Sequence, residues 1–279
     1  MKKLYYVIIS VCSLALCGCT NFGRLYNQER KAELERTNAM INEKTITEED
    51  IAHLPSPVIR YFRNCGYIDT PYIYHADTIW EKSYIRLKPE AKWMNMHTRQ
   101  FNSIPNPMRL AHMKTKVMGL FPMEGRDKSA DGEGHMYGKI MGLFTVFDAK
   151  DLQISQSALI TIFAETLFFP TYALQDYISW EAVDELTAIA RISYRGLDAE
   201  GIFHFDEDGT LARFETNDRY YALPNGDYTK YPWFCEIESY KQQGALLIPE
   251  IVSANWDIDG EVFCYWKGQI SEIKYNALK

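Results

Sequence analysis

Two carboxylates with aromatic neighbours are the residues whose types and setting could perform catalysis. Glu165 lies in an apolar segment just before Phe168 and Phe169, and Glu181 directly follows Trp180. Glycosidases use a pair of carboxylates as acid and base, so the two residues could form such a pair. The alternative is structural. A carboxylate in an apolar segment needs a partner, and we favour an ion pair between Glu165 and an arginine such as Arg60 or Arg219.

Other catalytic and metal-binding patterns are missing from the sequence that follows residue 18. It contains no G-x-S-x-G, H-E-x-x-H, P-loop or C-x-x-C motif, and its six histidines are scattered. Asp127-x-Ser129-x-Asp131-Gly132 resembles the first half of a calcium-binding loop, but Gly138 stands where the bidentate glutamate belongs. We therefore expect a hairpin turn there, with no metal site and no cofactor.

The first nineteen residues have the order of a bacterial lipoprotein signal. Lys2 and Lys3 precede an apolar run over residues 4–16, and the run ends in Leu16-Cys17-Gly18-Cys19. The run is short for a membrane-spanning helix. The resemblance to a lipobox implies that residues 1–18 are a signal peptide and that Cys19 is lipidated. An uncleaved N-terminal anchor is the alternative.

Net charge, the residue after Cys19 and the cysteine count indicate which partners and which cellular location are expected. The formal net charge of −7 gives no indication of a nucleic-acid surface. An acidic surface is also not attracted to anionic lipid head groups, so the lipid on Cys19, and not the protein surface, would hold the chain at a membrane. Thr20, where an aspartate would indicate inner-membrane retention, suggests the outer membrane facing the periplasm if the cell is Gram-negative. Beyond Cys19, the odd number of remaining cysteines (Cys65, Cys235 and Cys264) favours small buried thiols over a disulfide framework.

The elements that must position these residues follow from the apolar patterns. Residues 19–46 are polar and predict either a lipidated tether or a docked helix. A helix is expected over 151–169, ended by Pro170, and strands before and after it. Strands are predicted at 178–184, 187–195, 200–206, 210–221, 233–241, 246–257 and 261–275. Short polar segments separate them, including the Asp208-Gly209, Asn225-Gly226 and Asp259-Gly260 turns. We predict one α+β domain over 47–279, a long curved antiparallel sheet with helices packed on one side.

Several motifs together resemble an uncharacterised bacterial family that is known only as a domain of unknown function. The similarity covers roughly residues 50–275, and members of that family are often lipoproteins. Its motifs are Leu54-Pro55-x-Pro57-Val58-x-Arg60-Tyr61-Phe62, Gly125-x-Asp127 with Gly132-x-Gly134, Ala164-Glu165 with Pro170, Trp180-Glu181, Pro232-Trp233 and Tyr265-Trp266-Lys267-Gly268.

The C-terminal strands also resemble the broader lipoprotein-carrier (LolA/LolB-like) superfamily. The similarity rests on Tyr240, Gly244, Leu247-Ile248-Pro249, Gly260 and the final run from Ile270 to Asn276. It implies a half-barrel covered by helices, with an apolar cavity for acyl chains and the 151–169 helix as a lid. Fold alone does not determine function.

From these observations we expect a non-enzymatic, membrane-anchored envelope lipoprotein that binds a hydrophobic small molecule or lipid. The aromatic residues could instead simply fill the sheet. A glycan hydrolase that uses Glu165 and Glu181, and a structural or assembly lipoprotein that acts through its surface, remain the alternatives. The expected lining residues are Trp80, Trp93, Phe163, Leu167, Trp256 and Trp266.

Overall fold

The computed structural model describes residues 21–277, so the signal segment and Cys19 lie outside the described residues. None of the helices in this range is long and apolar enough to cross a membrane. The helices are α2 (Phe22–Asn38), α3 (Glu48–Ile51), α4 (Ser56–Asn64) and α5 (Leu152–Ala164), with the 3-10 helix η1 (Pro170–Leu174).

One antiparallel sheet of 13 strands dominates the fold, in the order β6-β5-β4-β3-β2-β1-β15-β14-β13-β10-β9-β8-β7. A separate two-stranded sheet pairs β11 with β12. The strands are β1 (His75–Ile85), β2 (Met94–Ser103), β3 (Met108–Val117), β4 (Phe121–Ala130), β5 (Glu133–Ile140), β6 (Phe144–Ala149), β7 (Ile178–Ala182), β8 (Thr187–Tyr194), β9 (Leu197–Phe205), β10 (Leu211–Thr216), β11 (Tyr220–Ala222), β12 (Tyr228–Lys230), β13 (Trp233–Gln243), β14 (Leu246–Ile258) and β15 (Glu261–Tyr275).

The first strand of the sheet pairs with the last, and this pairing joins the two halves of the chain. β1 runs antiparallel to β15 from Ala76↔Tyr275 to Ile85↔Trp266. The sheet curves around α5 and stays open, since β6 and β7 stand at opposite ends of the strand order. The predicted α+β class and the curved antiparallel sheet are confirmed.

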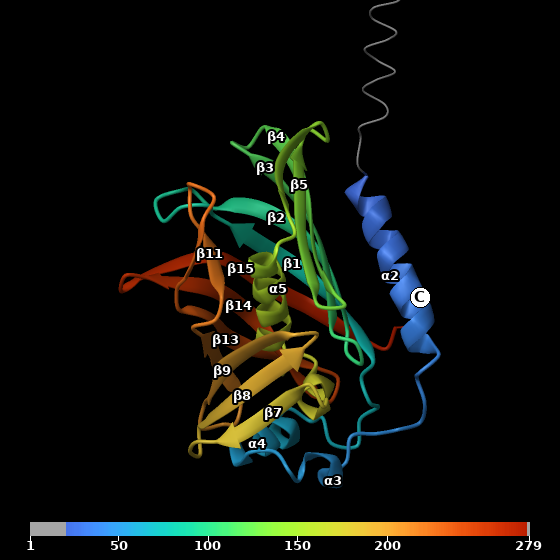
Figure 1. The fold of residues 1–279 in the computed structure, drawn as a ribbon. Coiled ribbons are helices and arrows are strands. Elements are labelled where there is room, and N and C mark those ends of the chain that lie inside the picture. Colours follow the sequence, from blue (N-terminus) through green and yellow to red (C-terminus); the bar gives the residue numbers. More distant parts are fainter. Residues whose placement is uncertain (1–20, 278–279) are drawn as a thin grey trace, which may run out of the picture.

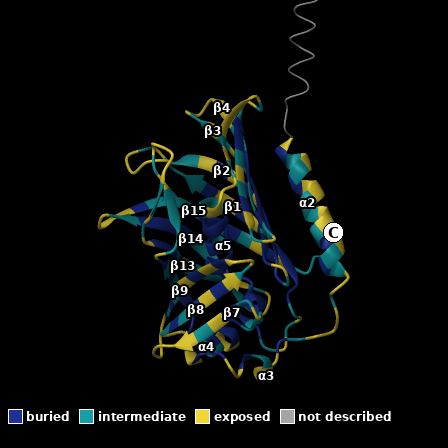
Figure 2. Ribbon diagram, in the orientation of Figure 1, coloured by how far each residue is buried: buried dark blue, intermediate teal, exposed yellow. Residues whose placement is uncertain are grey.

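Helix α5 lies inside the curve because its sequence is apolar on nearly every side. Nine of its 13 residues are buried, and the Asp151 side chain caps its first turn by accepting from the Ile154 amide. Figure 2 shows buried residues gathered on α5 and on the strand faces around it. The helix ends at Ala164, earlier than predicted, and Pro170 begins the 3-10 helix η1 instead.

Helix α2 packs on the outer face of β2, β3 and β4, opposite to α5 (Figure 1). Phe22 and Tyr26 are almost fully buried there, and Glu29 pairs with Arg126 at 2.6 Å. Of the segment 19–46, for which two interpretations were left open, Phe22–Asn38 thus forms a helix docked on the sheet.

Candidate functional site

A cavity of about 190 Å³ lies on the inner face of the sheet, beside the last turn of α5. Strands from both halves of the chain meet there, because the β1–β15 pairing brings β1–β4 next to β13–β15. Its lining residues are Trp80, Ile85, Met96, Thr98, Arg109, Ala111, Met113, Asp127, Met136, Thr161, Ala164, Glu165, Phe168, Arg219, Trp233, Cys235, Val252, Ala254, Tyr265 and Trp266.

Two tryptophans on neighbouring strands form much of the apolar wall. The rings of Trp80 and Trp266 meet edge to face, with centroids 4.9 Å apart. Gly268 leaves the space for this contact, since a Cβ at that position would lie 2.6 Å from the Trp80 ring and 2.7 Å from the Trp266 ring. The last residue of the Tyr265–Gly268 motif therefore has a steric reason to be glycine.

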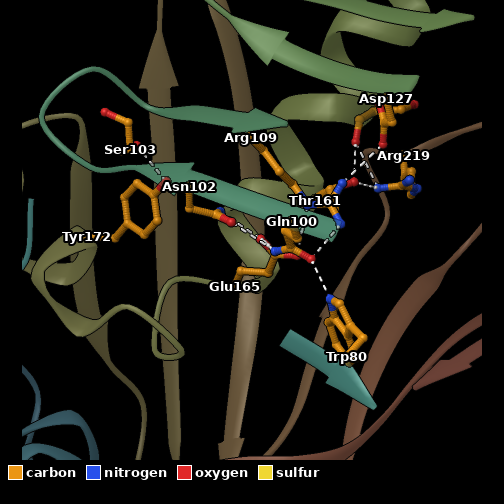
Figure 3. Close-up of polar contacts among 11 residues, drawn as sticks. Trp80, Gln100, Asn102, Ser103, Arg109, Asp127, Thr161, Glu165, Tyr172 and Arg219 are labelled. Carbon is orange, nitrogen blue, oxygen red and sulfur yellow. Dashed lines mark hydrogen bonds and ion pairs between the residues drawn. The ribbon is translucent and has the colours of Figure 1, made fainter. Parts of the chain in front are cut away.

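A connected set of polar side chains lies beside these tryptophans, and we name it the polar network: Gln100, Asn102, Arg109, Asp127 and Glu165 (Figure 3). Of these, Arg109, Asp127 and Glu165 line the cavity. Arg109 is its centre. Its Nε donates to Glu165 Oε1 at 2.9 Å, its Nη1 to Asp127 Oδ2 at 3.2 Å and its Nη2 to Gln100 Oε1 at 3.2 Å. All three guanidinium nitrogens therefore have partners within the chain.

The second oxygen of Glu165 is equally well bonded. Its Oε2 accepts from Gln100 Nε2 at 3.0 Å and from Asn102 Nδ2 at 2.9 Å. Trp80 joins the network through its Nε1, which donates to Gln100 Oε1 at 3.1 Å. Because Glu165 is the C-cap of α5, the network attaches the end of this helix to β2 and β3.

A second arginine, Arg219, lies between β10 and β11 and also lines the cavity. Its Nη1 donates to the Ser157 carbonyl and to Thr161 Oγ1, both at 2.8 Å. Its guanidinium carbon stands 4.4 Å from the centre of the Trp233 ring, a cation–π distance. All of these contacts are to neutral groups.

Burial affects the titrating groups of the site in different ways. Burial acts to lower the pKa of Arg109, but the charges of Glu165 and Asp127 outweigh it and raise that pKa. Burial raises the pKa of the Cys235 thiol, which is therefore protonated at neutral pH. A neutral thiol is a poor nucleophile, so the site offers no activated cysteine.

The sequence-predicted lining residues are distributed over three places. Trp80 and Trp266 line the cavity, and Trp93 lines a neighbouring open groove. Phe163 and Leu167 are fully buried in the core, and Trp256 packs against Tyr221 at a centroid distance of 5.2 Å. Only the first two therefore share one cavity.

The structure also corrects the expected partner of Glu165. Arg109 forms the ion pair, whereas Arg60 donates to the Glu185 carbonyl and Arg219 to the neutral groups described above. Glu181 is exposed on β7, while its neighbour Trp180 packs inward on Phe203. Because successive strand residues point to opposite faces, the structure does not bring Glu165 and Glu181 to one site.

Four members of the polar network besides Glu165 were not predicted. Thr98, Gln100 and Asn102 alternate along β2, so the sequence does carry a polar strand face, but nothing in it indicates that this face is buried. From the sequence, Asp127 was placed in the expected hairpin turn. It lies instead in β4, and the expected hairpin turn is confined to Asp131 and Gly132, whose φ angles are 54° and 83°.

The polar network involves none of the scattered histidines. Within residues 21–277, no group of three or more histidine, cysteine, aspartate or glutamate side chains could hold a metal ion. The geometry therefore describes an apolar cavity with one charged wall, which suits the binding of an amphipathic molecule.

Comparison with known proteins identifies a family to which no activity is assigned. The model of a family of unknown function, DUF6544, matches residues 44–268. The chain belongs to this family. The predicted membership of an uncharacterised family is thereby confirmed. No curated protein matches the sequence.

Solved structures of low sequence identity are similar to this chain over much of its length. A LolA superfamily protein from Nitrosomonas europaea has 8% identity and a TM-score of 0.41, covering 77% of this chain and 91% of that chain. A DUF1329 family protein from Desulfovibrio piger has 8% identity and a TM-score of 0.44, covering 83% and 94%. A putative outer membrane lipoprotein-sorting protein domain from Vibrio parahaemolyticus has 8% identity and a TM-score of 0.36, covering 72% and 85%. At this identity the likeness says nothing about activity.

Proposed function

We propose that the protein binds the apolar chain of a hydrophobic small molecule or lipid in the inner cavity, without catalysis. The observation that carries this proposal is the cavity itself. It has an aromatic and aliphatic wall from both halves of the sheet and one charged wall. An apolar chain that left water for this space would gain hydrophobic free energy in proportion to the area buried.

The size of the cavity limits the ligand. Its volume of about 190 Å³ exceeds the ~150 Å³ of an engineered apolar cavity that binds benzene. It is smaller than the ~300–1,000 Å³ of pockets that enclose drug-sized molecules. We therefore propose that one chain is enclosed, and not a whole lipid with two chains.

An open groove next to the cavity offers room for the rest of a longer ligand. The groove has a volume of about 1080 Å³ and shares Trp80 and Met96 with the cavity. Trp93, Met94 and Met123 add apolar surface to it. A ligand could thus hold one chain inside and extend its remainder along the groove.

We further propose that lipidated Cys19 anchors the protein to an envelope membrane, as the lipobox implies. Figure 1 places the start of α2 at the same end of the molecule as the β3–β4 hairpin. The ends of this hairpin and of the β5–β6 hairpin carry large exposed apolar side chains: Met118, Leu120, Phe121, Met141, Leu143, Phe144 and Val146. Only Thr20 separates Cys19 from the described chain, so an anchor there would hold these hairpin ends close to the bilayer.

Native mass spectrometry of the protein, purified gently from a bacterial envelope, tests the binding proposal. We expect a protein mass increased by one bound molecule of a few hundred daltons, identifiable as an acyl or other apolar species after denaturation. A protein that carries no such mass and takes up no added single-chain lipid would contradict the proposal.

The anchor has a separate test, the intact mass of the denatured protein. The wild type should lack residues 1–18 and carry covalent acyl chains. A Cys19→Ser variant should carry none and should leave the membrane fraction or remain an uncleaved precursor. An unmodified Cys19 in the wild type would overturn the anchor and leave the ligand proposal in place.

A further inference from the structure

The two cavity arginines differ in how far their donors are used. Arg109 gives every guanidinium nitrogen a partner, and two of these partners are carboxylates. Arg219 uses only Nη1, on two neutral oxygens. Its Nε is buried without a hydrogen-bond partner, and its Nη2 donates to no group within residues 21–277.

The unused Nε–Nη2 edge of Arg219 is the edge that suits a carboxylate. Nε and Nη2 point the same way and can donate to both oxygens of one anionic group. Five other arginines within residues 21–277 use this same edge on an aspartate or glutamate: Arg30, Arg36, Arg63, Arg126 and Arg213.

The surroundings of Arg219 leave its charge without a direct counter-ion. No carboxylate in the described part of the chain forms an ion pair with it, and the two carboxylates of the cavity lining, Asp127 and Glu165, are both paired with Arg109. Burial lowers the pKa of Arg219, yet a guanidinium stays protonated at neutral pH. A buried cation that lacks an anionic partner is costly, although the Trp233 ring offsets part of that cost.

Arg219 also lines the same cavity as the apolar wall of Trp80, Trp266 and Phe168. The cavity thus presents a hydrophobic surface together with one unsatisfied cation. We propose that Arg219 binds the anionic head group, a carboxylate or a phosphate, of a single-chain amphiphile whose chain occupies the cavity. This inference rests on the proposed function and adds the chemical class of the ligand.

Calorimetric titration of the folded protein with decanoate, decanol and decyl phosphate tests the inference, with both anions below their micelle-forming concentrations and decanol below its solubility limit. The three probes share one chain and differ in the head group. We expect an anionic probe to bind at least about tenfold more tightly than decanol, the range of a charge-assisted hydrogen bond. Comparison of decanoate with decyl phosphate identifies which anion is preferred.

Variants assign any such preference to Arg219. Arg219→Gln should remove the preference, so that this variant binds decanol and the two anionic probes with similar affinity. Arg213→Gln is the matched control, because Arg213 also stacks on an aromatic ring, that of Phe234, but lies outside the cavity. Arg219→Lys keeps the charge without the planar edge and should retain only part of the preference.

The outcomes separate the two proposals. Equal affinity of the wild type for decanol and both anions would overturn the role of Arg219 and leave the proposed function standing. Retention of the anion preference by a folded Arg219→Gln variant would also overturn it. Failure of all three probes to bind the wild type would contradict both proposals. If Arg219→Gln does not fold, Arg219→Lys carries the assignment, and an unchanged preference in that variant would overturn the role of the planar edge.

Discussion

The last turn of α5 faces two differently packed regions. On one side Phe163 joins an aromatic cluster with Phe203 and Phe214, in which all three rings are fully buried with centroids 4.9–5.6 Å apart. On the other side, two residues later, Glu165 enters the polar network beside the cavity. One helix turn therefore separates a filled interior from a hollow one.

This difference shows where a cavity can persist in a fold that is rich in aromatic residues. Apolar rings interdigitate freely and fill the available volume. The side chains of the polar network are fixed by directional hydrogen bonds, so they cannot shift to fill the space beside them. The charged wall thus explains both the hollow and its suitability for an amphipathic ligand.

Loss of Arg109 should cause the largest loss of unfolding free energy, because it removes the centre of the polar network. Arg109→Met leaves the buried Glu165 and the half-buried Asp127 without their cation, and breaking a buried ion pair typically costs about 3–5 kcal/mol. Urea unfolding measures the loss. Arg191→Met is the control, because its pair with Glu200 is exposed and worth less than about 1 kcal/mol. Equal losses in the two variants would show that the polar network does not hold α5 in place.

Substitution of one glycine in each region compares how tightly the aromatic cluster and the cavity wall are packed, with a smaller expected loss of stability. In the aromatic cluster, a Cβ at Gly201 would lie 2.3 Å from the Phe214 ring, and at Gly268 beside the cavity it would lie 2.6 Å from Trp80. Gly201→Ala should cost about 1–3 kcal/mol of unfolding free energy through overpacking. Gly268→Ala should cost less than half as much, because Trp80 can move into the empty space. A larger loss for Gly268→Ala would mean that the cavity wall is as rigid as the cluster.

The smallest expected effect is that of acid, which should weaken the docking of α2 on the outer face of the sheet more than the packing of α5 beside the cavity. Burial lowers the pKa of His75, which contacts Thr37 of α2, and that of His112, which lies beside Tyr26. A lowered pKa in the folded state means that the unfolded state binds protons more tightly. The stabilising effect is therefore present above the ordinary pKa of 6.5 and is lost as the pH falls through the lowered values.

Hydrogen exchange, corrected for its intrinsic pH dependence, measures this effect. Protection of α2 should fall between pH 7.5 and pH 5.5 more than protection of α5. His75→Asn and His112→Asn should each reduce the difference. A fall that is equal in both helices would contradict a role for these two histidines in docking α2.

The sequence predicted the C-terminal half of the fold well, for a local reason. Asp-Gly and Asn-Gly turns mark the ends of its strands, so the predicted run 261–275 coincides with β15 (Glu261–Tyr275). The 210–221 run was wrong in one respect, since it is divided into β10 and β11 by the loop that carries Arg219. Such local turn signals do not reveal the pairing of β1 with β15, which joins residues almost 200 positions apart.

The site was harder to predict, because its decisive contacts are between distant segments. Nothing near Glu165 in the sequence indicates Arg109, 56 positions earlier, as its partner. The sequence was equally unable to show which aromatic residues line the cavity. Phe163 and Trp80 are of similar character in the sequence, and only the placement of the polar network decides that Trp80 lines the cavity and Phe163 does not.

The most direct test of the central claim, that the cavity holds an apolar chain, is decanol binding by the wild type and by Ala254→Leu. Ala254 is a buried lining residue, so leucine there fills part of the cavity. We predict that the wild type binds decanol, and that Ala254→Leu binds at least tenfold more weakly while it unfolds at nearly the same urea concentration. Equal binding by both proteins, or no binding by the wild type, would contradict the account.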